Sequence, residues 1–156
     1  MNTYEKLLET AENNNITVLE KYDLSDTRIK GLYCDGTIAL DINIKSDIEK
    51  GCILAEELGH YYTSSGDILD MTSAANRKQE HKARLWAYNN RIGLHGIISA
   101  YKAGCRNAHE MAEHLDVTEE FLIEALSCYQ KKYGICADVD NYVIYFEPAL
   151  SVLELI

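Results

Sequence analysis

The sequence predicts an α+β domain in which strands come first, helices follow, and strands return near the end. Two observations support this prediction. Alternating apolar residues flank an Asp35-Gly36 pair, which is typical of a β-hairpin. From residue 46 to residue 133, apolar residues recur at helical spacing. The 156 residues include one proline and no repeat or low-complexity linker, so we expect a single domain spanning residues 1–156.

The N-terminal part of the chain is predicted to form a helix, a short strand and a hairpin. Residues 4–13 have apolar side chains at helical spacing, and residues 16–19 favour a strand. The hairpin arms are expected over residues 28–34 and 37–44. The second arm alternates cleanly, which predicts a half-buried strand whose inward side chains are Ile38, Leu40, Ile42 and Ile44.

The middle of the chain is predicted to be helical. Ser46-Asp47-Ile48-Glu49 is a capping box, so a helix should begin there, run through His60 and end near Gly66. A strand pair is expected at the end of the chain, over residues 136–146 around Asp140-Asn141. The remaining predicted helices cover residues 73–91, 94–103, 107–115 and 118–133.

Residues 52–60, Cys-Ile-Leu-Ala-Glu-Glu-Leu-Gly-His, are the strongest candidate for chemistry. Zinc peptidases carry H-E-x-x-H on a helix, with two His ligands one turn apart and a Glu as general base. Here Glu56 stands in the place of the first His, while Glu57 and His60 match the pattern. Residues four apart share a helix face, so Glu56 and His60 can reach one ion. From spacing alone, a solvent-facing Glu-Glu pair with a coincidental His explains the pattern equally well.

A second segment, Glu-His-Lys-Ala-Arg-Leu-Trp-Ala, follows at residues 80–87. Together with residues 54–60 it resembles the ImmA/IrrE family of metallopeptidases, whose pattern is L-A-H-E-L-G-H followed by E-x-x-A-x-x-(aromatic)-A. The order of the other elements is similar over most of the chain. The resemblance implies a zincin-like minimal metallopeptidase domain with a small N-terminal sheet and a helical C-terminal half. In such folds the strand before the motif helix pairs with extended substrate, a role expected for residues 38–44 alongside core packing.

The resemblance also implies roles for single residues. His60 and Glu80 would be zinc ligands and Glu57 the general base, with Glu56 as the remaining ligand. Two carboxylates and one imidazole neutralise a divalent ion and make it a poorer Lewis acid. Their oxygen donors extend the choice of metal from Zn to Mn or Fe. Asp67 is a candidate to orient His60 through its second ring nitrogen, or else a turn-forming residue.

Helix geometry favours Glu80 over its neighbour as a ligand. Glu80 shares a face with Ala83 and Ala87, whose small side chains allow close packing on the motif helix, although a solvated carboxylate is the alternative. His81 lies about 100° further round the helix and should not face the ion if Glu80 does. Gly59 is unusual inside a helix, where it costs about 1 kcal/mol relative to Ala, and it predicts close approach of another backbone.

Residues 94–133 have a helix-turn-helix-like pattern with a tight turn at Asp116. Between residues 106 and 133 there are three Lys or Arg and six Asp or Glu, so core packing or a protein partner is expected rather than DNA. His109 and His114 look like a second metal motif. They are five residues apart and point about 140° away from each other, so a shared ion is not expected.

The composition excludes several classes of partner. Fifteen Lys and Arg against 25 Asp and Glu give a formal charge of −10, which disfavours nucleic acid and anionic membranes. No apolar run approaches the roughly 18 residues of a membrane span, and the N-terminus lacks a signal pattern. The five cysteines contain no C-x-x-C pair and are expected to be buried, reduced thiols. We therefore expect a cytoplasmic protein.

The sequence thus favours a metal-dependent endopeptidase. Zn, or Mn or Fe, would be held by Glu56, His60 and Glu80, with Glu57 as the catalytic residue. The resemblance implies a protein substrate, a helix-turn-helix repressor of phage type, and a gene carried on a prophage or mobile element. The alternative is a catalytically inactive family member that binds and sequesters a repressor. A third hypothesis is an acidic interaction module without a metal.

Overall fold

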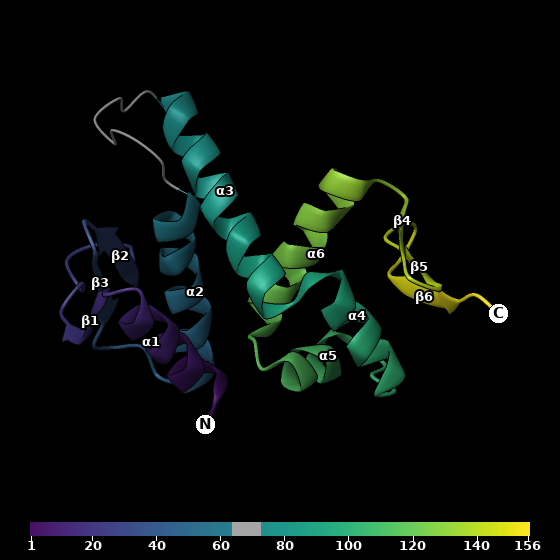
Figure 1. Ribbon diagram of the computed structural model, residues 1–156, viewed down its shortest axis with the longest axis horizontal. Helices are drawn as coiled ribbons and strands as arrows, with labels where there is room; N and C mark the ends of the chain where they lie inside the picture. The colour runs from purple at the N-terminus through teal and green to yellow at the C-terminus, as the bar shows by residue number, and fades with distance from the viewer. Residues whose placement is uncertain (64–72) are drawn as a thin grey trace. The chain divides into compact units, whose positions relative to one another are not determined.

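The computed structural model describes residues 1–63 and 73–156 (Figure 1). The chain forms two compact units, Met1–Ala87 and Tyr88–Ile156, and each is described by itself. Helices are combined with two separate three-stranded sheets, so the predicted α+β class is confirmed. The expectation that residues 1–156 fold as one domain stays a prediction.

The first unit combines a small sheet with helices. Its strands follow the order β1-β3-β2, with β3 parallel to β1 and antiparallel to β2. Helix α1 packs on α2, and α2 in turn packs on β2 and β3. In chain order the elements are α1 (Thr3–Asn13), β1 (Thr17–Tyr22), β2 (Gly31–Cys34), β3 (Thr37–Asp41), α2 (Asp47–Thr63) and α3 (Ser73–Arg91), whose last residues, 88–91, belong to the second unit.

The predicted hairpin is confirmed, with shorter arms. Asp35 and Gly36 adopt φ values of 44° and 78°, as a two-residue turn of type I′ requires, and the turn pairs Cys34 with Thr37. β2 begins at Gly31 and β3 ends at Asp41, so residues 28–30 and 42–44 of the predicted arms are not part of the two strands.

The predicted half-buried alternation of β3 is wrong in two places. Ile38 and Leu40 are fully buried as expected, but Ala39 is also buried at 7% exposure and Ile42 is 52% exposed. β3 is the central strand, so the small side chain of Ala39 has neighbouring strands on both sides. Ile42 lies beyond the end of the strand, where the alternation no longer applies.

Helix α2 begins where the capping box predicts. The Glu49 backbone N–H donates to Ser46 Oγ at 3.1 Å, and the Glu49 carboxylate forms an ion pair with Lys30 Nζ at 2.5 Å. The helix is described to Thr63, and the predicted end at Gly66 lies outside the described residues. The fully buried side chains of α2 are Leu54, Ala55 and Leu58.

The second unit contains three helices and the second sheet. The sheet has the order β4-β5-β6, antiparallel throughout. The hairpin around Asp140 is confirmed, whereas β6 was not predicted. In chain order the elements that follow α3 are α4 (Gly93–Lys102), α5 (Ala108–Leu115), α6 (Glu119–Tyr133), β4 (Cys136–Val139), β5 (Tyr142–Tyr145) and β6 (Ser151–Glu154).

The tight turn in the helical part lies where the sequence predicts it. Asp116 ends α5 in the left-handed region with φ 57°, and Thr118 caps α6 by accepting a hydrogen bond from the Phe121 N–H at 3.1 Å. His109 lies between two carboxylates, with Nε2 at 3.0 Å from Glu113 and Nδ1 at 2.7 Å from Glu119. These contacts raise the pKa of His109, the hydrogen bond to Glu119 contributing most.

All five cysteines are free thiols. Cys52 is buried as expected, Cys105 and Cys128 are half-buried, and Cys34 and Cys136 are exposed, so the expectation of buried thiols is wrong for the last two and met in full only by Cys52. Cys34 and Cys136 lie on edge strands, β2 and β4, where one side of the backbone has no neighbouring strand. In the described part of the chain, no helix has both the length and the apolar character needed to cross a bilayer.

Candidate active site

The two helices that carry the predicted site residues touch through their backbones. A Cβ placed on Gly59 of α2 would lie 2.2 Å from the carbonyl oxygen of Ala83 on α3 and 3.0 Å from its Cα. No side chain fits between these atoms, so the predicted close approach at Gly59 is confirmed. Because Gly59 precedes His60 and Ala83 is one helical turn after Glu80, this contact brings the two side chains together.

His60 and Glu80 are two candidate ligands whose side chains are in direct contact. His60 Nε2 lies 3.2 Å from Glu80 Oε1, and the His60 side chain is only 22% exposed. Two ligands bound at about 2.0–2.1 Å in a tetrahedral arrangement are roughly 3.3 Å apart. The separation of the donor atoms is compatible with two ligands of one zinc ion, and it is equally that of a direct hydrogen bond between the two side chains. Arg84 approaches the other carboxylate oxygen of Glu80, with Nε at 4.0 Å from Oε2.

Glu57 projects from α2 and contacts the edge strand β2. Its carboxylate accepts a hydrogen bond from the backbone of Tyr33. Gly31, two residues earlier on β2, lies so close that a Cβ there would be 2.6 Å from Ile53 Cγ2 and 3.1 Å from Glu57 Cγ. The absence of a side chain at Gly31 thus leaves room for the Glu57 side chain.

The surroundings of Glu57 favour its protonated form in the metal-free protein. Burial raises the pKa of Glu57 from its ordinary 4.5 to about 7, and the negative charges of Glu56 and Glu80 act in the same direction. The hydrogen bond from Tyr33 acts in the opposite direction and is the smallest contribution. A carboxyl group with a pKa of about 7 can gain or lose its proton near neutral pH.

The four predicted site residues line one cavity of about 620 Å³. Among the residues that the structure describes, no three His, Cys, Asp or Glu side chains are gathered closely enough to hold a metal ion. The donor types and the His60–Glu80 separation are compatible with a metal. The roles of Glu56, His60 and Glu80 as ligands and of Glu57 as the general base stay predictions. The other lining residues are Arg28, Ile29, Lys30, Gly31, Leu32, Tyr33, Ile53, Asn76, Gln79 and Arg84.

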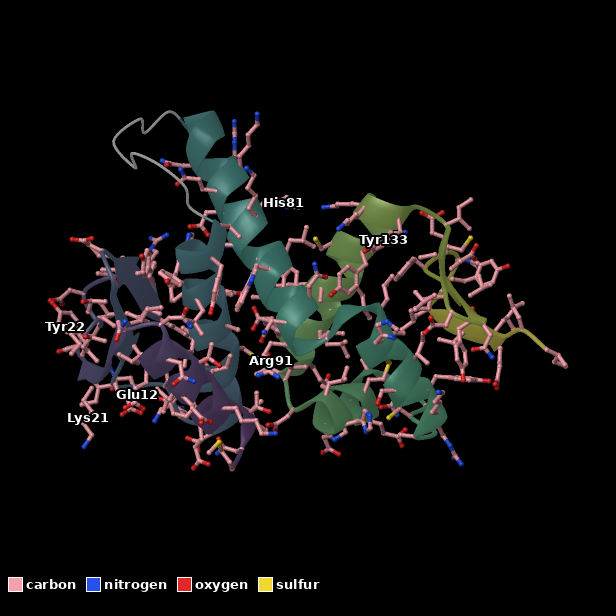
Figure 2. All side chains as sticks on the ribbon, viewed as in Figure 1. Glu12, Lys21, Tyr22, His81, Arg91 and Tyr133 are labelled. Atoms are coloured by element: carbon pink, nitrogen blue, oxygen red, sulfur yellow. The ribbon has the colours of Figure 1, made fainter. Side chains whose placement is uncertain are left out.

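Two further residues were candidates for the site, and the structure describes one of them. His81, labelled on α3 in Figure 2, is exposed, as expected if Glu80 faces the site. It borders a separate depression on that helix. Asp67, the candidate to orient His60, lies outside the described residues.

The strand expected to pair with substrate is the wrong one. β3 has β1 on one side and β2 on the other, so it offers no free edge. The edge that borders the cavity belongs to β2. The Asp41 N–H donates to the Lys30 carbonyl at 2.9 Å, so Lys30 and Asp41 are a hydrogen-bonded pair. Hydrogen-bonded and non-hydrogen-bonded pairs alternate along an antiparallel ladder. The backbone N–H and C=O groups of Gly31 and Tyr33 therefore point away from β3. Tyr33 accordingly meets Glu57 on that side.

Sequence reasoning missed Gly31, Tyr33 and Arg84 as parts of the site. A glycine inside a predicted strand often marks a close approach, which was the available signal for Gly31. Arg84 follows Glu80 by four residues, the spacing of helical ion pairs. Tyr33 acts through its backbone, so its side chain gave no signal.

Comparison with known proteins agrees with this geometry. The family model of Peptidase M78, described as the IrrE N-terminal-like domain, matches residues 11–127, which include both helices of the site and β2. No curated protein matches the chain. No solved structure matches it either. The match covers most of the chain and bears out the resemblance found from the motif segments. The chain belongs to the Peptidase M78 (ImmA/IrrE) family, a family of metallopeptidases.

Proposed function

We propose that this protein is a metal-dependent endopeptidase that cuts a cytoplasmic protein, a helix-turn-helix repressor of phage type. The observation that carries this proposal is the His60–Glu80 pair at 3.2 Å in the cavity that Glu57 also lines, within an M78 chain. The catalytic residue is Glu57, and the metal ligands are His60, Glu80 and Glu56.

Each residue has a distinct task in this mechanism. Zinc, or Mn or Fe, held by the three ligands would polarise the scissile carbonyl and make a water molecule more acidic. Glu57 accepts the proton of the attacking water and delivers it to the leaving amine. The Tyr33 backbone keeps the Glu57 carboxylate on the cavity side of β2 during both transfers.

Substrate enters along the edge of β2. An extended peptide can exchange main-chain hydrogen bonds with Gly31, whose N–H and carbonyl point towards the cavity side. Exposed apolar side chains near this edge, Ile29 and Leu32 at 45% each, offer contacts for substrate side chains. This arrangement supports cleavage of a loop or unfolded segment, because pairing at a strand edge needs an extended chain whose main-chain N–H and C=O groups are free.

The test uses purified, untagged protein and the repressor encoded beside its gene. We expect a stoichiometric transition metal and cleavage of the repressor at one site, detected by mass spectrometry. Glu57→Gln should abolish cleavage while the metal stays bound. Protein that takes up no metal after reconstitution would contradict the peptidase proposal.

A second candidate is an inactive member that sequesters the repressor. It is supported by Glu56 in the place of a histidine and by the lack of a three-donor group among the described side chains. Bound metal and repressor binding without cleavage would favour it. Glu56→His should tighten zinc binding if Glu56 is a ligand, and unchanged affinity would show that the first ligand is another residue.

A further inference from the structure

Helix α3 carries a group of positively charged side chains that the site does not use. Four exposed residues line a shallow depression of about 410 Å³, and among the residues that the structure describes they are its whole lining. Figure 2 shows nitrogen-tipped side chains along this end of α3, near the labelled His81. We call this surface the basic face of α3, and it consists of Arg77, Lys78, His81 and Lys82.

The basic face is separate from the active-site cavity. At 100° per residue, its four members span about 140° of the helix circumference. Glu80 and Ala83, which meet α2, lie on roughly the opposite side of α3. Between residues 76 and 91, Glu80 is the only carboxylate, and it is engaged with His60 and Arg84.

This arrangement does not serve the stability of the helix. Lys78 and Lys82 are like charges four residues apart, a spacing that destabilises a helix. Among the described residues, no acidic side chain forms an ion pair with Arg77, Lys78 or Lys82. Three full positive charges are thus gathered on a protein whose formal charge is −10. A surface of this kind is complementary to an acidic ligand.

We propose that the basic face of α3 binds an acidic segment of the protein substrate. This inference rests on the proposed peptidase function, which provides a protein substrate. The face extends over residues 77–82, about 7.5 Å along the helix, so it matches a short run of carboxylates. A long nucleic acid would also meet the rest of a protein of charge −10, because the field of the surrounding charges reaches about 8 Å at physiological salt.

The geometry also sets where the acidic segment lies in the substrate. A substrate chain must pass halfway round α3 to reach from the active-site cavity to the basic face. Half the circumference of a helix of about 10–12 Å diameter is roughly 17 Å. An extended chain covers this path with about five residues at roughly 3.3 Å per residue. The acidic residues should therefore be at least about five positions away from the scissile bond.

Fluorescence anisotropy of a labelled decaglutamate peptide with the full-length protein provides the test. We compare two triple variants with the same change in net charge. One reverses the basic face, and the other reverses exposed lysines on α1, β1 and the loop before α2. The first variant is Arg77→Glu, Lys78→Glu, Lys82→Glu, and the control is Lys6→Glu, Lys21→Glu, Lys45→Glu.

We expect the peptide to bind wild-type protein, the first variant to bind it about tenfold more weakly, and the control to stay within about twofold. Equal weakening in both variants, or no binding by wild type, would overturn the proposal. So would tighter binding of a 20-base-pair DNA duplex than of the peptide. If the first variant loses its helical circular dichroism, the triple Gln variants of both sets take the place of the triple Glu variants, so that the change in net charge stays matched, with the same expectations.

The result is independent of catalysis, because no peptide bond is cut in this assay. Loss of peptide binding in the first variant together with no repressor cleavage by wild type would retain the docking surface and reject the peptidase. Cleavage of the repressor at unchanged kcat/KM in the first variant would reject the docking surface and retain the peptidase.

Discussion

Replacing Gly59 with alanine should separate the two helices of the site. A Cβ at this position would be 2.2 Å from the Ala83 carbonyl oxygen, whereas ordinary contact begins at 3.4 Å, so the backbones must move apart by about 1 Å. Overpacking of this kind costs about 1–3 kcal/mol, and a backbone neighbour that cannot rotate away favours the upper end. Alanine regains about 1 kcal/mol of helix propensity. We expect Gly59→Ala to lower the free energy of unfolding by about 2 kcal/mol.

Gly51→Ala in the same helix is the matched control. Gly51 is also buried, but a Cβ there would meet its nearest atoms, those of Tyr4, at 3.8 Å, an ordinary contact. This variant should gain up to about 1 kcal/mol of stability from helix propensity alone. The two alanines should therefore differ by about 3 kcal/mol in urea denaturation followed by circular dichroism.

The site provides a second readout for the same pair of variants. Separation of α2 from α3 moves Glu80 away from His60, so Gly59→Ala should also weaken zinc binding, while Gly51→Ala should leave it unchanged. Equal stability of the two variants would refute the close contact between Gly59 and Ala83. Lower stability with full zinc affinity in Gly59→Ala would refute its role in the spacing of the ligands.

The remaining predictions concern charge. The raised pKa of Glu57, about 7 against 4.5, means that the folded metal-free protein holds this proton more tightly than the unfolded chain, so stability falls as pH rises from about 5 to 8. The free energy of unfolding should fall by about 3 kcal/mol over this range. Glu57→Gln should remove this dependence of stability on pH, measured by urea denaturation in the presence of a chelator. The same pH dependence in both proteins would contradict the prediction. Glu119→Gln should lower the pKa of His109, measured by NMR titration, because the hydrogen bond to Glu119 is the main cause of its upward shift. The stability from this pair is present at low pH and is lost as pH rises through the pKa of His109 in the folded protein. Glu80→Gln should weaken zinc binding by at least tenfold, while Glu113→Gln, a change of equal charge in the other unit, should not, as measured by competition with a chromophoric chelator.

Local signals in the sequence account for much of the fold. The Asp35-Gly36 turn and the helix starts near residues 107 and 118 depend on neighbouring residues. The structure places the turn as predicted and begins the two helices one residue later, with Asn107 and Thr118 as their N-caps. The small residues on one face of residues 80–87 and Gly59 in the motif helix predicted the contact between α2 and α3. That contact is the part of the site that the sequence pattern alone predicted.

Features that depend on distant partners could not be predicted in this way. β6 has four residues, and β5 determines its pairing, so it lacks a periodic pattern of its own. Ala39 is buried because β3 lies between two strands. One of them is the parallel strand β1, in which Leu19, 20 residues earlier in the sequence, pairs with Ala39. The edge beside the cavity belongs to β2 for the same reason. Local alternation cannot show which strand lies in the middle.

The engagement of Tyr33 has a consequence for selectivity. Of the two β2 residues whose backbone groups point away from β3, Tyr33 already has a hydrogen bond to Glu57, which leaves the Gly31 N–H as the main-chain donor for an incoming chain. A peptide docked there gains few sequence-independent bonds. Discrimination among peptides at this edge must therefore depend on their side chains, so the peptidase activity proposed for this chain should be selective.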